Sequence, residues 1–297
     1  MTVTITPFDL LPDDLVDQVA AGALDAASAD GVAPLSEAFE LALPRPGTHH
    51  VAADGDDLAG YASVAEDGSV ELFVHPDRRA KGVGTRLLDR VLQERPDARP
   101  WAHGDLPAAR ALAARLGLQV VRELLVLSRD VREGDETDPS LPEGVRHRTF
   151  VPGTDETALL EANAAAFVHH PEQGALDRAE LDERMAQPWF DPEGVILLED
   201  DDPSRLVGFH WTKIDPPGGD VGEVYVVGVH PDCQGRGLAG PLTGLGLAHL
   251  ARRGVREVEL YVEGDNTPAL ATYERAGFAR KALHVMYSHE VHPSVQG

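Results

Sequence analysis

The segment from Gln234 to Gly240 carries the residue pattern that most clearly suggests chemistry. It reads Gln-Gly-Arg-Gly-Leu-Ala-Gly and follows a hydrophobic run at 224–229. Small residues let a backbone approach a ligand closely, and free N–H groups at the start of a helix favour an anionic group such as a pyrophosphate. A glycine-rich loop is by itself more often a turn. The preceding hydrophobic run and the central Arg236 favour a phosphate site here.

The same pattern occurs earlier in the chain, which indicates an internal duplication. Residues 70–92 lie over 224–247, and Val74–Asp77 matches Val229–Asp232 at an offset of 155, so that the segment 79–84, Arg-Ala-Lys-Gly-Val-Gly, corresponds to the later loop. Residues 103–118 then align with 263–278 at an offset of 160. Two matches in the same order predict two copies of one domain of about 150 residues.

The segments around the loops predict an α/β fold, with a mixed α+β sheet at the centre of each copy. The runs 70–74 and 224–229 each end at a His-Pro step, where the missing proline N–H ends strand pairing. A run of alternating apolar residues at 258–262 precedes a helical pattern from about 267 to 276, and Gly277 suits the C-terminal cap of that helix. Alternating strands and helices predict a sheet with helices packed against it.

The chain length agrees with two domains. The protein has 297 residues, and domains commonly contain about 100–200. Residues 131–145 are acidic, contain two prolines and lack a hydrophobic period, so they are predicted to form an exposed linker. We therefore expect domains at 1–130 and 146–297.

Composition excludes several classes of partner. The chain has 50 acidic and 26 basic residues, a formal charge of −24, which disfavours nucleic acid and anionic membrane surfaces as partners. No run approaches 18 apolar residues and the N-terminus is acidic, so we expect a cytoplasmic protein. The single cysteine, Cys233, and the adjacent His169 and His170 offer no ligand spacing typical of a metal site. We expect no metal.

Strand, glycine-rich loop and helix together resemble the acetyl-CoA pyrophosphate loop of the GCN5-related N-acetyltransferase (GNAT) superfamily. Both copies show the resemblance, and Asn266 with the segment 273–278 resembles a late segment of that superfamily, N-x-x-A-x-x-x-Y-x-x-x-G-F. The resemblance covers nearly the whole chain. It implies two tandem GNAT domains and acetyl-CoA as the acetyl donor.

A narrower resemblance is to the mycothiol synthases, a family of tandem enzymes within this superfamily. The segments that carry it are 30–34 with Glu37, 101–104, 170–174, 189–194, 208–213 and 222–228. This resemblance implies acetyl transfer to the cysteinyl amine of cysteinyl-glucosaminyl-inositol, which yields mycothiol. The partner would be this small molecule, and we expect a monomer.

Comparison of the copies predicts that the C-terminal copy is catalytic. At the sequence offsets, Glu223 aligns with Gly68 and Tyr273 with Ala113, so the first copy lacks both functional side chains. An α-amino group has a pKa of about 8, so its proton must be removed before attack. The resemblance implies Glu223 as the base, acting directly or through water, and Tyr273 as the group that protonates the departing thiolate.

The resemblance also implies the binding residues. For the acceptor these are Glu37, Glu172, Lys213, Glu223 and Tyr261. For the coenzyme they are Leu72, Phe73, Val74, Ala80, Lys81, Gly82, Val83, Gly84, Thr85, Val227, Gly228, Val229, Gln234, Gly235, Arg236, Gly237, Leu238, Ala239, Gly240, Asn266, Thr267, Pro268, Ala269, Leu270 and Ala271. Backbone N–H groups at 227–229 would stabilise the oxyanion. Because the protein is acidic overall, Arg236, Lys81 and the loop N–H groups must attract the coenzyme phosphates locally.

Other functions remain open from the sequence. The acceptor could be another amine, such as an aminoglycoside or a protein N-terminus. A non-catalytic acyl-CoA sensor is a further alternative, although it would not need both Glu223 and Tyr273. Glu40 could replace Glu37 as a ligand. A thiol nucleophile at Cys233 is disfavoured because the superfamily reaction is a direct transfer.

Overall fold

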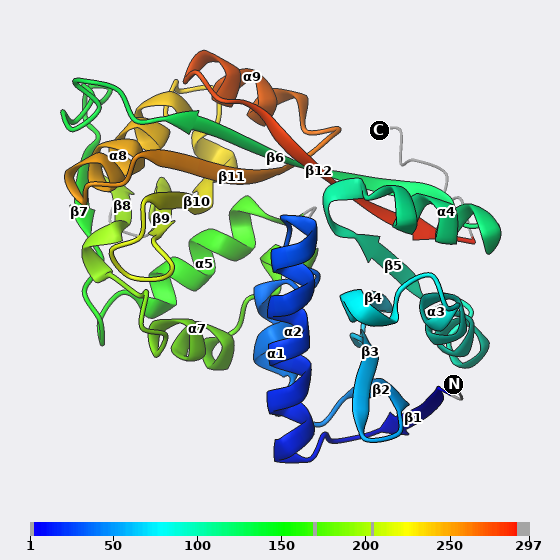
Figure 1. Ribbon diagram of the computed structural model, residues 1–297. Coiled ribbons are helices and arrows are strands. Elements are labelled where there is room, and N and C mark those ends of the chain that lie inside the picture. The colour runs from blue at the N-terminus through cyan, green and yellow to red at the C-terminus, as the bar shows by residue number, and fades with distance from the viewer. Residues whose placement is uncertain (1–2, 169–170, 203–204, 290–297) are drawn as a thin grey trace. The chain divides into compact units, whose positions relative to one another are not determined.

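The computed structural model describes residues 3–168, 171–202 and 205–289. The chain divides into two packed units, each with a central sheet covered by helices (Figure 1). Of the described residues, 3–124 and 282–289 form unit 1, and those between 125 and 281 form unit 2. Residues 282–289 thus group with unit 1, whereas the sequence analysis assigned them to the second domain.

Unit 1 has a mixed sheet in the order β1-β2-β3-β4-β5-β12. Strands β1 to β4 are antiparallel to their neighbours, β4 and β5 are parallel, and β5 pairs antiparallel with β12 through Val285 and Met286. The elements are β1 (Thr4–Phe8), α1 (Asp13–Asp30), α2 (Glu37–Ala42), β2 (Thr48–Asp54), β3 (Asp57–Val64), β4 (Ser69–Val74), η1 (Pro76–Arg78), α3 (Val83–Glu94), β5 (Arg99–Ala102), η2 (His103–Asp105) and α4 (Pro107–Arg115). Two strands are shared with unit 2: unit 1 contains residues 119–124 of β6 (Gln119–Asp130) and residues 282–288 of β12 (Ala279–Ser288).

Helices α1 and α3 cover opposite faces of this sheet (Figure 1). Alternation along β3 decides which face each residue joins: Tyr61 packs with α1, and Ala62 packs with α3. Glu71 and Phe73 on β4 share the face of α1, because residues two apart point the same way and Phe73 packs with α1. Both faces are therefore buried, as expected for an α/β domain.

Unit 2 repeats this arrangement, with the sheet order β6-β11-β10-β9-β8-β7. Within the described part of this sheet, β10 and β11 are parallel, whereas β10 with β9, β9 with β8 and β8 with β7 are antiparallel. Its elements are β7 (Arg146–Thr149), α5 (Glu156–Ala166), α6 (Pro171–Gly174), α7 (Arg178–Met185), η3 (Pro192–Gly194), β8 (Val195–Glu199), β9 (Gly208–Lys213), β10 (Val221–Val229), η4 (Pro231–Cys233), α8 (Ala239–Arg252), β11 (Glu257–Glu263) and α9 (Thr267–Arg275). Unit 2 also contains residues 125–130 of β6 and residues 279–281 of β12.

The two faces of the unit 2 sheet have different covers. Helices α5 and α7 pack with Phe209, Trp211 and Val226, whereas α8 packs with Val224 and the alternating apolar residues of β11. Within the described residues, no helix is long and apolar enough to cross a membrane. Residues 131–145, all of which the structure describes, contain no buried residue and no helix or strand. The α/β prediction is confirmed, and α9 begins at Thr267 as predicted.

A buried histidine makes unit 2 sensitive to acid. His210 on β9 is fully buried, and its Nδ1 lies 2.9 Å from the Leu242 carbonyl, so it must carry the proton at Nδ1. Its ring packs directly on α8, because a Cβ on Gly246 would lie 1.9 Å from Cε1 of the ring. Burial lowers the pKa of His210 to about 4.

We therefore expect the protein to lose stability as the pH falls from 6.5 towards 4. The unfolded chain binds more protons than the folded chain in this window, and the loss from His210 at pH 5.5 is about 1.4 kcal/mol. Thermal unfolding at pH 7.5 and 5.5 measures it. His210→Asn, which keeps a donor for the Leu242 carbonyl, should reduce the pH dependence, whereas His147→Asn at an exposed site should not. An equal pH dependence in the wild type and His210→Asn would contradict this expectation.

Candidate active site

The glycine-rich loop of unit 2 has the backbone geometry of an anion cradle. Gly235 and Gly237 have φ of +77° and +74°, the left-handed region that glycine occupies without strain. The loop runs directly into α8, which begins at Ala239 and whose first-turn N–H groups have no partner within the helix. This backbone geometry is typical of loops that bind phosphate, and the phosphate site itself stays a prediction.

The corresponding loop of unit 1 has the same alternation of dihedral angles. Ala80 and Gly82 have φ of +59° and +76°, and α3 begins at Val83. Ala80 adopts a conformation that costs a residue with a Cβ about 1–2 kcal/mol, which is consistent with a loop shape kept for binding.

A pocket of about 570 Å³ adjoins the unit 1 loop. It extends between β4 and β5 to α4, and all the coenzyme residues predicted in this copy line it except Lys81, namely Leu72, Phe73, Val74, Ala80, Gly82, Val83, Gly84 and Thr85. The Nζ of Lys81 instead donates to the Asp77 carbonyl at 2.9 Å. Its expected role in binding phosphate stays a prediction.

The arginines of both loops are held by carboxylates of their own unit. Arg236 donates to Asp200 at 2.7 Å, and this hydrogen bond holds the pKa of Asp200 below its ordinary value. Arg79 makes a two-pronged pair with Asp30, at 2.6 and 2.8 Å. The charge of Arg236 is therefore partly neutralised, and the loop N–H groups gain importance as anion ligands.

Strand β10 separates from β11 after their first four paired residues. The parallel pairing runs from Val221 to Val224, so the segment 227–229 predicted to bind the coenzyme lies beyond it. The pairing of β10 with β9 slips by one residue between Val224 and Val226, which makes Tyr225 a β-bulge. Backbone groups beyond the last pair are therefore free of β11 and can face a ligand.

Lys213, Glu223 and Tyr261 project from the same face of the sheet. Glu223 lies opposite Lys213 on β9 and beside Glu259 on β11, and Tyr261 follows Glu259 by two residues. Directly opposed residues bring their Cβ atoms to about 4.5–5.5 Å. Desolvation and then the charges of Glu223 and Glu259 raise the pKa of Tyr261 to about 12, which keeps its phenol protonated. Three of the five predicted acceptor residues thus form one cluster.

Two aromatic rings contact the Lys213 side chain in this cluster. Its Nζ lies 4.7 Å from the centre of the Trp189 ring and 5.4 Å from that of Tyr225, and 3.5 Å from Asp215. Tyr225 accepts a hydrogen bond from Arg184 of α7 at 3.0 Å. Sequence analysis missed Trp189, Tyr225 and Arg184 as parts of the site, although Trp189 lies in one of the segments that carried the resemblance. Cation–π contact with these rings holds the Lys213 side chain on the face of the sheet from which Glu223 projects.

Tyr273 lies on the other face of the sheet. It is 8% exposed and belongs to the apolar cluster of α8 and β11, with its ring 5.9 Å from that of Phe278. Burial raises the pKa of Tyr273 to about 12. The predicted base Glu223 and the predicted proton donor Tyr273 therefore lie on opposite faces of the unit 2 sheet, and their roles stay predictions.

The bulge corrects one sequence alignment. At the constant offset of 155, Glu223 aligns with Gly68. Strand pairing gives a different equivalent: Glu223 lies opposite Lys213 of β9, and the corresponding position in unit 1 is Ser69, which lies opposite Ala65 after β3. The extra residue at Tyr225 shifts the register by one. The first copy still lacks a carboxylate there.

The other predicted residues Glu37, Glu172 and Asn266 belong to different elements from those that carry this cluster. Glu37 is the first residue of α2 in unit 1. The Glu172 side chain falls outside the part of the chain that the structure describes. Asn266 caps α9 by accepting from the Ala269 N–H at 3.2 Å, which gives it a structural role in addition to the predicted one.

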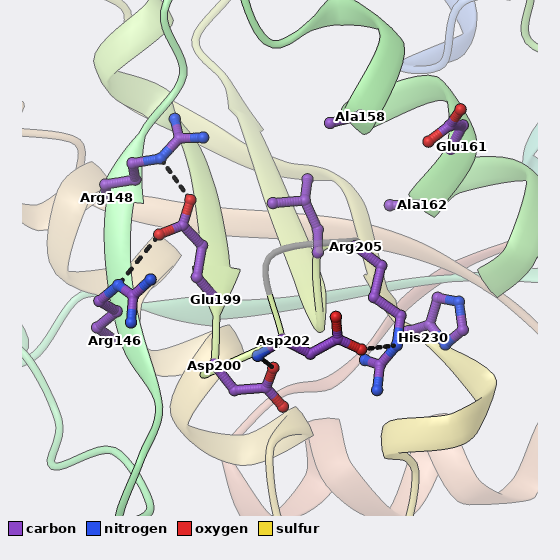
Figure 2. Close-up of a pocket in the computed structure, with 11 residues that line it drawn as sticks. Arg146, Arg148, Ala158, Glu161, Ala162, Glu199, Asp200, Asp202, Arg205 and His230 are labelled. Atoms are coloured by element: carbon purple, nitrogen blue, oxygen red, sulfur yellow. Dashed lines mark hydrogen bonds and ion pairs between the residues drawn. The ribbon is translucent and has the colours of Figure 1, made fainter.

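A second pocket, of about 310 Å³, lies beside the unit 2 loop. Figure 2 shows Arg146 and Arg148 both directed at Glu199, with Glu161 of α5 on the opposite wall. Arg205, also in the wall, donates to the buried Cys233 Sγ at 2.9 Å. The charges of the described lining residues are largely paired with one another. His230 directly follows the segment 227–229, and the described lining residues include none of the predicted coenzyme or acceptor residues.

Comparison with known proteins identifies the family. The model of the acetyltransferase (GNAT) family matches residues 158–278, and a GNAT domain model matches residues 45–117. A mycothiol acetyltransferase of Thermomonospora curvata is 49% identical over 94% of this chain and 95% of its own length. The chain belongs to the mycothiol acetyltransferase family. A mycothiol acetyltransferase of Catenulispora acidiphila is also 49% identical, over 87% of the chain and 90% of its own length.

Solved structures agree with the tandem fold of the family. A GCN5-related N-acetyltransferase from Sphaerobacter thermophilus is 29% identical, with a TM-score of 0.69, and covers 98% of this chain and 97% of its own. A tandem GNAT protein from the clavulanic acid biosynthesis pathway has a TM-score of 0.74 at 19% identity and shows the fold alone; the alignment covers 99% of this chain and 100% of its own. The prediction of two GNAT domains is confirmed.

Proposed function

We propose that the protein transfers the acetyl group of acetyl-CoA to the cysteinyl amine of cysteinyl-glucosaminyl-inositol, the step that forms mycothiol. The observation that carries this proposal is the identity of 45–49% with mycothiol acetyltransferases over most of the chain. The cluster of Lys213, Glu223 and Tyr261 supports it, because these side chains can bind a polyhydroxyl ligand that carries an ammonium group.

The residues of unit 2 divide the reaction between the two faces of the sheet. Glu223 removes a proton from the acceptor ammonium, directly or through water, and the neutral nitrogen attacks the thioester carbonyl carbon. Backbone N–H groups at 227–229 stabilise the oxyanion. When the carbon–sulfur bond breaks, Tyr273 donates a hydrogen bond to the thiolate, which then takes a proton. The nitrogen loses a second proton as the amide forms, and this proton balances the one gained by the thiolate. The first proton, taken from the ammonium by Glu223, is released to solvent, and the products are the amide and free coenzyme A.

Three further predictions from the sequence accompany this proposal. The domains would extend over 1–130 and 146–297 in sequence, with 131–145 as the linker. The first domain would bind coenzyme without catalysing transfer. The enzyme would act on its small-molecule substrate as a cytoplasmic monomer and without a metal.

Acetyl-CoA turnover with a panel of acceptors tests the proposal. We expect cysteinyl-glucosaminyl-inositol to be acetylated with a kcat/KM at least about 100-fold above that of an aminoglycoside or a peptide with a free N-terminus, because only the first suits the whole polar cluster. Glucosaminyl-inositol, which lacks the cysteinyl amine, is the matched control. Preference for the aminoglycoside or peptide would overturn the assignment, and binding without turnover of any acceptor would favour the sensor.

A further inference from the structure

A buried arginine holds the C-terminal end of α9 in unit 2. Arg129 lies on β6 and is 8% exposed. Its Nη1 donates to the Ala276 carbonyl at 2.8 Å, and its Nη2 donates to the Asp135 carboxylate. Its Nε donates to the Asp130 carbonyl at 3.1 Å. All three guanidinium nitrogens are therefore engaged, and one side chain ties the strand, the predicted linker and the helix together.

A second arginine closes over the same helix end. The Arg132 backbone N–H donates to the Asp135 carboxylate at 2.7 Å, and its Nη2 donates to the Gly277 carbonyl at 3.5 Å. The guanidinium packs on the glycine itself, because a Cβ on Gly277 would lie 2.5 Å from Nη2. The last carbonyls of a helix lack partners within the helix and carry partial negative charge. Two arginines therefore compensate the end of α9.

This helix end is firmly connected to Tyr273. The Phe278 N–H donates to the Tyr273 carbonyl at 3.0 Å. The Gly277 N–H donates to the Glu274 carbonyl at 2.9 Å, with Gly277 at a φ of +87°. This is the Schellman arrangement, which closes the last turn of a helix. Ala276 follows Tyr273 by three residues, and residues three apart are neighbours on the helix surface. A shift of the Ala276 carbonyl therefore moves the Tyr273 ring with it.

The predicted linker is fixed to unit 2 beyond Asp135 as well. Arg252, at the end of α8, donates to the Glu136 carbonyl at 2.9 Å and to the Asp138 carboxylate at 2.7 Å. Pro139 packs on the same helix, because a Cβ on Gly244 would lie 3.0 Å from the proline ring. Contacts on both sides of it therefore keep Asp135 in place as the partner of Arg129.

The equivalent helix end in the first copy does without arginine contacts. At the offset of 160, Gly117 and Ala113 correspond to Gly277 and Tyr273. Gly117 has a φ of +72°, and the Leu118 N–H donates to the Ala113 carbonyl at 3.0 Å, so α4 ends with the same turn. Apart from its chain neighbours, no atom of the described residues lies within 4 Å of a Cβ built on Gly117. The turn thus forms unaided, and the arginines accompany the copy that has the tyrosine.

We propose that Arg129 is a positioning residue for acetyl transfer, which together with Asp135 sets the place of the Tyr273 hydroxyl at the departing thiolate. Both residues lie outside the segment 146–297 that the sequence predicts as the catalytic domain. The end of β6 and the linker thereby contribute to the reaction of unit 2. This inference rests on the proposed role of Tyr273 in the transfer, and the experiment distinguishes failure of the one from failure of the other.

A double-mutant cycle between Arg129→Lys and Tyr273→Phe tests the positioning role. Lysine keeps the charge but lacks the planar fork, so it cannot hold Asp135 and the Ala276 carbonyl in the same geometry. We expect Arg129→Lys to lower kcat about 5- to 20-fold, with the KM of each substrate within about twofold, because a displaced hydroxyl affects the transition state most. In the Tyr273→Phe background the same substitution should lower kcat by less than about twofold, since the hydroxyl is absent.

Two further variants keep the test independent of folding. Asp135→Asn keeps the size of the side chain and one acceptor oxygen. Should Arg129→Lys fail to fold, Asp135→Asn should lower kcat at least about threefold in the wild-type background and less than about 1.5-fold in the Tyr273→Phe background. Arg256→Lys, at an exposed ion pair of unit 2, is the matched control and should leave kcat within about 1.5-fold in both backgrounds.

The outcomes separate the positioning role from the proposed function. Equal kcat losses from Arg129→Lys in both backgrounds, or an unchanged kcat in the wild-type background, would overturn the positioning role alone. A Tyr273→Phe variant as active as the wild type would overturn both that role and hydrogen-bond donation by Tyr273, and would leave acetyl transfer in place. The cycle needs only an acceptor that the wild type acetylates, so preference for another amine would overturn the proposed substrate and not the coupling. A wild type that acetylates no acceptor would overturn both proposals.

Discussion

Replacing Glu223 with Gln is expected to lower kcat by about 10²- to 10⁴-fold with little change in the KM for acetyl-CoA. Proton transfer by a positioned side chain contributes a factor of this size. The substitution keeps the shape and polarity of the side chain but removes the basic oxygen. Steady-state kinetics with the cysteinyl acceptor at saturating acetyl-CoA measures the effect.

The neighbouring strand offers a matched control. Glu259 lies beside Glu223 in the β10–β11 register, but its carboxylate is an ion-pair partner of Lys281. Glu259→Gln removes the same charge from the same region of unit 2, so it separates loss of a base from loss of general negative charge. We expect its kcat to stay within about threefold of the wild-type value, since a screened charge contributes little. Equal losses in the two variants would contradict a base at Glu223.

Local features of the fold were predictable from the sequence because they depend on neighbouring residues. Strand ends at the His-Pro steps, the glycine-rich loops and the start of α9 at Thr267 all follow from missing N–H groups, left-handed glycines and capping. The duplication was visible because the same local constraints recur in both copies. These predictions needed no knowledge of which strand pairs with which.

The bulge at Tyr225 was not predictable, because its cause is tertiary. Nothing in the run 221–229 distinguishes a strand with an extra residue from a regular one. Tyr225 is held by packing on Trp189 and Trp211 and by Arg184, which are 14 to 41 residues away in sequence. A one-residue shift changes which face each side chain joins, so the equivalent of Glu223 had to be read from strand pairing.

The assignment of residues 282–288 to unit 1 was likewise beyond the sequence. An alternating or apolar run predicts a strand but not its partner, and Val285 and Met286 pair with β5, more than 180 residues earlier in the chain. That pairing brings His284 of β12 next to His103, whose Nδ1 lies 2.6 Å from His284 Nδ1 and whose Nε2 lies 3.1 Å from the Glu71 carboxylate. No local sequence pattern connects these three residues.

Replacing Tyr273 with Phe is expected to lower kcat by about 10- to 100-fold. A hydrogen bond to a charged group contributes about 1.5–3 kcal/mol, and the thiolate leaving group carries that charge only late in the reaction. Because burial raises the pKa of Tyr273 to about 12, above that of an ordinary thiol at about 8.5, full proton transfer to the thiolate is uphill. Tyr273 should therefore act mainly by donating a hydrogen bond, and solvent completes the protonation.

This variant has two controls: its own thermal stability, and a substitution in the glycine-rich loop of the first copy. Phe keeps the ring that packs against Phe278, so the melting temperature should change by less than about 3 °C, which corresponds to less than about 1 kcal/mol. Lys81→Ala, in the unit 1 loop, should leave kcat within about twofold, since Lys81 is exposed and bonds to a backbone carbonyl. A larger kcat loss in Lys81→Ala than in Tyr273→Phe would reverse the division of labour between the copies. An unchanged kcat in Tyr273→Phe would leave the buried tyrosine with a packing role alone and require another donor for the departing thiolate.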